Sequence, residues 1–156
     1  MDYEINKDTL LIMSKDKEKS RVIEKNAEYI IPKETIEVIE HSCEYFGSTY
    51  EGRHLGTKNL IGVTHKSPII IEESNNIIFF PTTSPRLKEC IWLSLNNILS
   101  YRQGRTAKST IIEFKNGKKI EIKVSVGSIN NQILRASRLD SILSARKKWK
   151  MYYFVI

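Results

Sequence analysis

The stretch STIIEFKNGKKIEIKVS at residues 109–125 alternates apolar and polar side chains on both sides of an Asn-Gly pair, which predicts a β-hairpin. A two-residue Asn-Gly turn would place Ile112 opposite the charged Glu121. A three-residue Lys-Asn-Gly loop instead pairs Ile112 with Ile120, because a one-residue change of register moves every side chain to the other face. The alternation therefore favours a type I turn that ends with Gly117 left-handed in a bulge.

This register gives the hairpin one apolar face and one polar face. The apolar face consists of Ile112, Phe114, Ile120, Ile122 and Val124. We expect the polar side chains of Glu113, Glu121 and Lys123 to face solvent or a partner.

Further apolar runs predict most of the remaining strands. Short runs between charged turns indicate strands at 9–13, 21–24 and 29–31. Four later runs lie at 68–73, 76–81, 90–95 and 98–103. The runs PIIIEE and NIIFFP do not alternate, so we expect their strands to be covered on both faces.

Two segments have the spacing of amphipathic helices. The first is predicted over about 32–46, because Pro32 suits the first turn of a helix. Apolar residues then recur every three or four positions, at Ile36, Ile39, Cys43, Phe46 and Tyr50. The second helix is predicted over about 128–148 with Ser128 as its cap. Its inward face would hold Ile129, Ile133, Ala136 and Leu143, and its outward face Asn131, Arg135 and Arg138. Together these elements predict one α+β domain with two helices and mainly antiparallel sheets.

Charge is distributed unevenly along the 156 residues, whose formal net charge is +7. Residues 1–46 hold 7 Lys and Arg against 11 Asp and Glu, whereas residues 47–156 hold 18 against 7. A positive field of this kind attracts polyanions, most often nucleic acid. Solvated lysines that only maintain solubility are the alternative reading.

The sequence predicts a cytoplasmic protein with reduced cysteines. No apolar run is long enough for a membrane helix, and MDYEINKDTL does not resemble a signal peptide. The two cysteines, Cys43 and Cys90, are far apart and form no CxxC pair, so we expect buried thiols.

No motif for catalysis, nucleotide binding or metal binding is present, so we expect no enzyme activity and no cofactor. His41 and Cys43 lie two residues apart, and such residues point to different faces of a helix. A zinc site would have to combine Cys43 and Cys90 with a distant histidine, whereas structural zinc sites usually bring ligands in close pairs.

The segment EYFGSTYEGRHLGTKNLIGVTHKSP at 44–68 reads as a binding loop. Its four glycines would let the backbone approach a partner closely. Arg53, Lys58 and Lys66 could contact phosphates, and nearby hydroxyl groups could donate hydrogen bonds. An irregular solvated connection is the alternative.

Several blocks of sequence resemble the ComK family of competence transcription factors. They are CEYFGSTYEGRHLGT, VTHKSPIII, NNIIFFPTTSPR, CIWLSL, the FKNGKKIEIKVS hairpin and NNQILRA. The resemblance is strongest over about 39–149. Members of the family carry a longer C-terminal region, so the unmatched tail at 150–156 suggests a C-terminally shortened member.

The resemblance implies a cytoplasmic activator that binds AT-rich promoter boxes of competence genes, largely through the minor groove. It also implies a homodimer or a dimer of dimers, with RNA polymerase and a proteolytic adaptor as further partners and with no membrane association. A protein-interaction module, or a shortened antagonist of a full-length homologue, is the alternative function, and an enzyme acting on an anionic substrate ranks last.

Basic and polar residues on turns suit a reader of the narrow minor groove of A·T steps. The predicted DNA contacts are Ser48, Tyr50, Arg53, His54, Lys58, His65, Lys66, Arg102, Arg105, Asn116, Lys118, Lys119, Arg135 and Arg138. They fall in the 44–68 segment, beside Gly104, around Gly117 and on the second helix. Which of the three turn regions enters the groove is left open.

Overall fold

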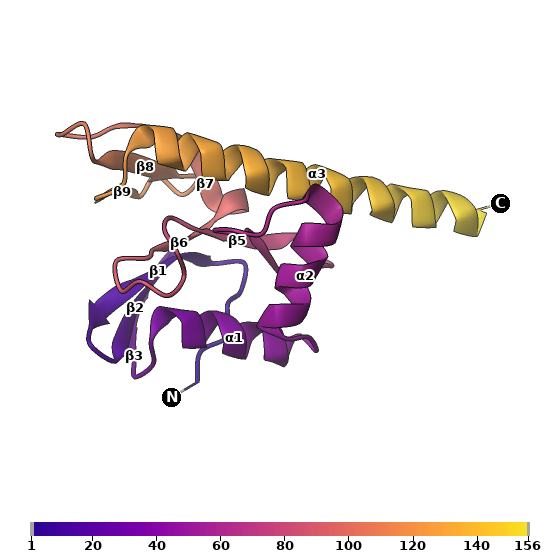
Figure 1. The fold of residues 1–156 in the computed structure, drawn as a ribbon, viewed down its shortest axis with the longest axis horizontal. Helices are drawn as coiled ribbons and strands as arrows, with labels where there is room; N and C mark the ends of the chain where they lie inside the picture. Colours follow the sequence, from indigo (N-terminus) through magenta and orange to yellow (C-terminus); the bar gives the residue numbers. More distant parts are fainter. Residues whose placement is uncertain (1, 156) are drawn as a thin grey trace.

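The computed structural model describes residues 2–155, with side chains described through Trp149. Its three α-helices are α1 (Thr35–Tyr45), α2 (Tyr50–Ile61) and α3 (Val126–Val155). Its nine strands are β1 (Thr9–Asp16), β2 (Lys19–Glu24), β3 (Glu28–Ile31), β4 (Ile69–Glu72), β5 (Ile77–Pro81), β6 (Trp92–Ser94), β7 (Ile98–Gln103), β8 (Thr110–Phe114) and β9 (Lys119–Ile122). The class is α+β, as the sequence predicts (Figure 1).

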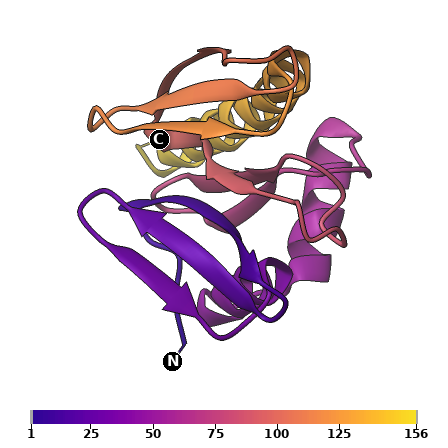
Figure 2. The ribbon, with the colours of Figure 1, turned by 90° about the vertical axis from the view of Figure 1, so that its left-hand side faces the viewer.

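Two antiparallel meanders join to form a six-stranded sheet with the order β3-β2-β1-β6-β5-β4. The join is the antiparallel pair of β1 and β6, in which Leu11 lies opposite Leu93 and Ile12 opposite Trp92. A separate sheet has the order β7-β8-β9. Figure 2 shows the small sheet stacked over the strands of the large one.

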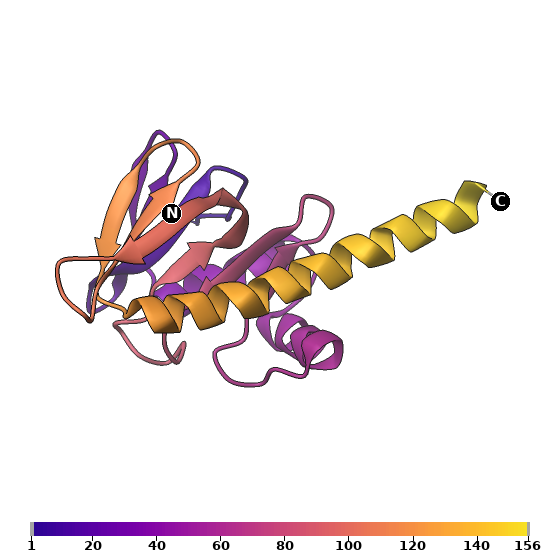
Figure 3. The ribbon, with the colours of Figure 1, turned by 90° about the horizontal axis from the view of Figure 1, so that it is seen from above.

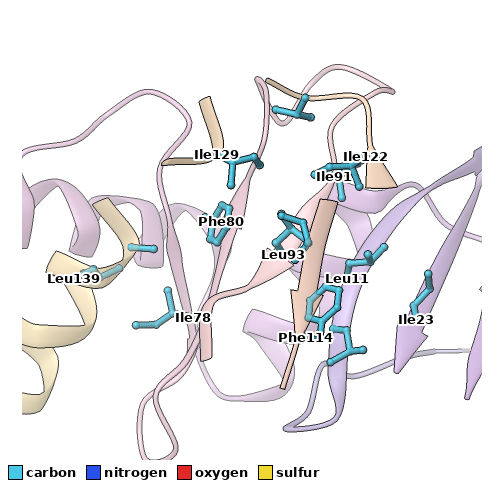
Figure 4. Close-up of a cluster of buried hydrophobic side chains, with 14 of the residues drawn as sticks. Leu11, Ile23, Ile78, Phe80, Ile91, Leu93, Phe114, Ile122, Ile129 and Leu139 are labelled. Carbon is cyan, nitrogen blue, oxygen red and sulfur yellow. The ribbon is translucent and has the colours of Figure 1, made fainter. Parts of the chain in front are cut away.

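The six-stranded sheet is the middle layer of the molecule and is covered on both faces (Figure 1). Helix α1 packs on one face, where Ile39 and Cys43 are buried with Trp92. Helix α3 and the small sheet cover the other face, where Leu139 and Phe114 belong to one cluster (Figure 4). Helix α2 contacts β4, the edge strand.

Strands β4 and β5 are buried on both faces, which confirms the expectation from their continuous apolar runs. Phe79 belongs to the cluster under α1, whereas Ile78 and Phe80 belong to the cluster under α3. Successive side chains of a strand point to opposite faces, so both faces must be apolar when both are covered.

The hairpin of β8 and β9 confirms the three-residue loop. Ile112 lies opposite Ile120, and the N–H of Phe114 donates to the carbonyl of Lys118 at 2.8 Å. Gly117 has a φ of 91°, the left-handed conformation that the bulge requires. Glu113 and Lys119 pair on the face away from the core.

Helix α1 confirms the predicted apolar stripe but begins later than expected. Ile39 and Cys43 are fully buried, and Ile36, Phe46 and Tyr50 pack against the same cluster. Pro32 lies outside the helix, because Glu34 and Glu37 form a reciprocal capping box at its start. The helix ends before Gly47, whose φ is 84°.

The prediction of a glycine-rich loop over 44–68 was wrong for its central part, because residues 50–61 form α2. The Thr49 hydroxyl accepts a hydrogen bond from the N–H of Gly52 at 2.9 Å and so caps the N-terminus. Gly62 ends the helix in the left-handed conformation, with a φ of 73°. Only Thr57 and Ile61 of this helix are buried, so its sequence carries little amphipathic signal.

Helix α3 begins at Val126, earlier than predicted. Ser125, rather than Ser128, occupies the capping position, since its hydroxyl accepts from the Ser128 N–H at 3.3 Å. The expected inward residues Ile129, Ala136 and Leu143 are buried, and Ile133 packs beside them. Figure 3 shows α3 extending well past the rest of the fold at its C-terminal end. Within residues 2–155, no helix is long and apolar enough to cross a membrane.

Candidate nucleic-acid interface

Opposite charges lie on opposite sides of the six-stranded sheet. Helix α1 carries Glu37, Glu40 and Glu44 and no lysine or arginine. Between Val126 and Trp149, α3 carries five basic residues and a single acidic one. Figure 1 places these two helices on opposite sides of the molecule. The side that α3 covers is therefore the side that attracts a polyanion.

The acidic side includes one carboxyl group in an unfavourable position. Burial raises the pKa of Glu40, and the negative charges of Glu51, Glu37 and Glu44 raise it further. Glu40 forms no ion pair with any of the described residues. The surface of α1 is consequently a poor place for a phosphate group.

Two of the predicted contacts on α2 meet each other at the wall of a cavity. The rings of Tyr50 and His54 stack with their centroids 6.0 Å apart. Both line a cavity of about 700 Å³ between α1, α2 and two loops. Burial raises the pKa of Tyr50 to about 12, so its hydroxyl is neutral at physiological pH. Lys58 lies exposed further along the helix, and Ser48 precedes the cap.

Arg53 points away from this cavity and is already paired. Its guanidinium donates to the carboxylate of Glu73 at 2.8 Å, and its side chain is only 16% exposed. The pair joins α2 to the turn between β4 and β5. Entry of Arg53 into a DNA groove would require this ion pair to break, so the structure gives this residue a supporting position.

Arg135 on α3 lies next to His65 and Lys66, although 70 and 69 positions separate it from them in the sequence. One guanidinium nitrogen of Arg135 donates to the carbonyl of His65 at 3.1 Å. The side-chain amide of Gln132, one turn earlier on α3, donates to the carbonyl of Lys66 at 2.8 Å. Arg138 is exposed on the next turn of the same helix. These residues form a basic surface on the α3 side of the molecule.

Arg102 lies near the end of β7, and Arg105 lies on the turn between β7 and β8, at the same end of the small sheet. The Arg105 side chain is 90% exposed, and its nitrogen Nε lies 3.4 Å from the carboxylate of Glu121. The N–H of Arg105 and the hydroxyl of Ser109 both donate to that carboxylate, which together lower the pKa of Glu121. A Cβ at Gly104 would meet the ends of the Glu121 and Ser109 side chains, so a larger residue here would displace the hydrogen bonds to this carboxylate.

Side-chain hydrogen bonds connect the turn around Gly117 to the end of β2 and the turn that follows it. The Asn116 amide donates to the carbonyl of Lys25 at 3.1 Å, and the Lys118 ammonium donates to the carbonyl of Glu24 at 3.1 Å. Lys119 is exposed on the outer face of the small sheet. Asn116 and Lys118 therefore connect the small sheet to the β2–β3 turn, and of this group Lys119 is best placed to contact a partner.

The predicted DNA contacts thus do not form one site. Arg102 and Arg105 lie at the end of β7 and on the turn that follows. His65 and Lys66 belong to the loop between α2 and β4, which contacts α3 near Arg135 and Arg138. The Asn116 turn lies at the other end of the small sheet, because β8 runs from one turn to the other.

Sequence reasoning missed Gln132 and Arg86. Gln132 is 1% exposed and occupies the inward face between Ile129 and Ala136, so a polar residue on an apolar face was the signal to notice. Arg86 lines the same cavity as Lys66. It lies within the Ser-Pro-Arg segment of the basic part of the chain, and its charge was the available signal.

Both cysteines are buried and free, as expected. Burial raises the pKa of Cys43 to about 11, which keeps its sulfur in the thiol form. No group of three His, Cys, Asp or Glu side chains suited to a metal ion occurs in the described part of the chain.

Comparison with known proteins identifies the family. The ComK protein family model matches residues 1–148, which extends further toward the N-terminus than the resemblance seen in the sequence. The competence transcription factor of Bacillus subtilis (strain 168) is 30% identical over 161 residues, covering 96% of this chain and 83% of that protein. No solved structure matches the chain significantly. Because the family model covers nearly its whole length, the chain belongs to the ComK family.

Proposed function

We propose that this protein is a DNA-binding transcription regulator of competence genes. The name of its Bacillus subtilis relative, competence transcription factor, supports the biological role. The observation that carries the DNA-binding part is the separation of charge between α1 and α3 on opposite sides of the central sheet. The positive side meets the duplex, and the acidic side faces away from it.

In this arrangement the α3 side supplies phosphate contacts and an exposed turn supplies groove contacts. Arg138 and the 65–66 loop lie along α3, where they can follow a backbone strand. Arg102, near the end of β7, and Arg105, on the turn that follows, suit entry into a narrow minor groove of A·T steps. The proposed target is an AT-rich promoter box, bound in the cytoplasm by a homodimer or a dimer of dimers.

The test compares three duplexes that differ only in the base pairs of the boxes. Inosine·cytosine pairs lack the guanine amino group in the minor groove but carry the major-groove pattern of G·C. Binding measured by fluorescence anisotropy should survive A·T to I·C replacement and fall with G·C. Equal loss with I·C and G·C would contradict minor-groove reading.

Matched variants test the proposed side of the molecule. Arg138→Ala removes an exposed charge from α3, and Lys17→Ala removes an exposed charge from the β1–β2 turn in the acidic third of the chain. Arg138→Ala should weaken binding about three- to tenfold at low salt and reduce the magnitude of the salt slope by about 0.9. Lys17→Ala should have little effect. Equal effects of the two variants would contradict the assignment of α3 to the DNA side.

A further inference from the structure

Hydrogen bonds to its carbonyl groups fix the loop between α2 and β4, residues 62–68. The hydroxyl of Ser67 donates to the carbonyl of Val63 at 3.3 Å, and the hydroxyl of Thr57 donates to that of Pro68 at 2.6 Å. The imidazole Nε2 of His54 lies 3.0 Å from the carbonyl of Thr64, which can only accept. This side of the loop is thus occupied by hydrogen bonds from α2 and from the loop itself.

Helix α3 holds the two carbonyls in the middle of the loop. Arg135 donates to His65, as described above, and the buried amide of Gln132 donates to Lys66. The same Gln132 nitrogen also lies 2.7 Å from the carbonyl of Pro81 on β5. Gln132 therefore fixes the loop relative to both the helix and the central sheet.

The backbone N–H groups of the same loop have no such partners. None of the N–H groups of Thr64, His65, Lys66 and Ser67 donates a hydrogen bond to another of the described residues. All four residues line the cavity of about 700 Å³. Lys66 has a φ of 49°, a left-handed conformation that is uncommon for a residue with a side chain. Successive N–H groups around a left-handed residue form a concave anion-binding site.

The charges near the loop also favour an anion. The loop carries Lys66, and Arg86 lines the cavity beside it. Arg135 uses only one of its guanidinium nitrogens, Nη1, in its described hydrogen bonds, so its remaining donors can serve a ligand. The carboxylates of Glu40 and Glu51 line the same cavity from α1 and α2 and would repel an anion there. The contacts that favour an anion are therefore those of the loop, Lys66 and Arg86.

We propose that residues 64–67 form a phosphate-binding loop, with Lys66 as its charged contact and Gln132 as the residue that positions it. Given the DNA binding proposed above, on which this inference rests, the ligand is one phosphate group of the DNA backbone. The N–H groups bind the phosphate oxygens, and the Lys66 ammonium neutralises the charge.

The experiment uses duplexes in which single phosphates are replaced by neutral methylphosphonates, one position at a time. The protein is compared with Lys66→Gly, which removes the ammonium group but suits the left-handed backbone. One position should exist at which neutralisation weakens the original protein about tenfold and Lys66→Gly only about twofold. The salt slope of Lys66→Gly should also be smaller in magnitude by about 0.9. Lys17→Ala serves as the control and should keep the original profile.

A second measurement does not depend on DNA. Inorganic phosphate added to the ¹⁵N-labelled protein should shift the amide resonances of residues 64–67, and Gln132→Glu, which cannot donate to the Lys66 carbonyl, should reduce those shifts. The circular dichroism spectrum and thermal unfolding of Gln132→Glu establish whether that variant is folded. The amide shifts of Lys66→Gly on addition of phosphate give a comparison that does not depend on Gln132.

The outcomes separate the two proposals. If the protein binds AT-rich duplex but its methylphosphonate profile is the same as that of Lys66→Gly, DNA binding stands and the loop proposal is overturned. If inorganic phosphate shifts the loop resonances but no duplex binds, the proposed function fails, and the ligand is a free phosphate or a phosphorylated small molecule instead of DNA. If neither ligand affects residues 64–67, the loop does not bind phosphate.

Discussion

Arg53 and Glu73, twenty residues apart, form a 2.8 Å ion pair that joins α2 to the turn between β4 and β5. The same turn is also joined to α3, since the Lys147 ammonium donates to the carbonyl of Glu73 and to the side-chain oxygen of Asn76. The Asn76 amide in turn donates to Asp140 at 2.6 Å. This short turn therefore connects α2, which packs against the edge strand β4, with α3, which covers one face of the sheet.

Arg53→Ala should reduce stability more clearly than it reduces DNA affinity. The variant loses the ion pair and the packing of the buried aliphatic stem, an effect of about 1 kcal/mol. Urea denaturation measures the loss, and Glu73→Gln gives the cost of the ion pair without loss of the stem. A large fall in DNA affinity with unchanged stability would show instead that Arg53 contacts DNA directly, as the sequence alone predicts.

Two substitutions of Asn76 separate the contribution of its hydrogen bonds to α3 from that of its left-handed backbone conformation. Its φ is 51°, a conformation that glycine adopts readily and alanine does not. Asn76→Gly loses the hydrogen bonds and should cost about 1–2 kcal/mol. Asn76→Ala should cost about 1 kcal/mol more because the left-handed conformation adds strain. Thermal unfolding measures the stability of both variants, and Asn76→Ala should unfold at the lower temperature. Equal losses of stability would indicate that the backbone conformation is unimportant.

Cys43→Ser should impair folding without affecting any chemistry. Cys43 is fully buried on the inner face of α1, where an unpaired hydroxyl costs about 1–3 kcal/mol. Cys43→Ala should be milder, because it leaves no buried polar group. In the folded protein Cys43 should react slowly with thiol reagents at pH 7, since its pKa of about 11 keeps the thiol protonated. Rapid modification of Cys43 under native conditions would contradict its burial.

Glu40→Gln should stabilise the protein at neutral pH. The pKa of Glu40 is raised in the folded state, so ionisation of this group begins to oppose folding as the pH rises above 4.5, the unfolded value, and the cost is complete above the folded-state pKa. The advantage of the variant should therefore be greatest above the folded-state pKa and should disappear as the pH falls through that pKa toward 4.5. Thermal unfolding from pH 4 to pH 8 measures the difference. Glu18→Gln, at an exposed turn, is the matched control. An equal gain in stability in both variants would show that the burial of Glu40 and the charges around it are not the cause.

The sequence predicted those elements whose local pattern agrees with their packing. The β8–β9 register followed from the phase of Ile112 and Ile120, because only one loop length places both on the same face. Helix α1 followed from its apolar stripe. Its start did not, because Pro32 was expected in the first turn, whereas Glu34 is the N-cap residue and the helix begins at Thr35.

Helix α2 could not be predicted in the same way. Gly52 and Gly56 lower its intrinsic helix propensity, each by about 1 kcal/mol relative to alanine, and its short buried face gives almost no periodicity. Caps at Thr49 and Gly62, together with contacts to β4 and α3, compensate for the glycines. The placement of Lys66 beside Gln132 was likewise beyond sequence reasoning, because it depends on a contact between residues 66 positions apart.

The pairing of β1 with β6 has a consequence for how the chain acquires its fold. Each meander consists of neighbouring strands joined by short connections or a single loop, so each can form locally. The seam between Leu11 and Leu93 instead closes a segment of about eighty residues. During synthesis the first meander must therefore wait, with one edge of β1 unpaired, until residue 94 has left the ribosome. We expect the formation of this seam to be a slow, late step in folding, and the open edge of β1 to be the point at which an incompletely synthesised chain is most exposed to aggregation.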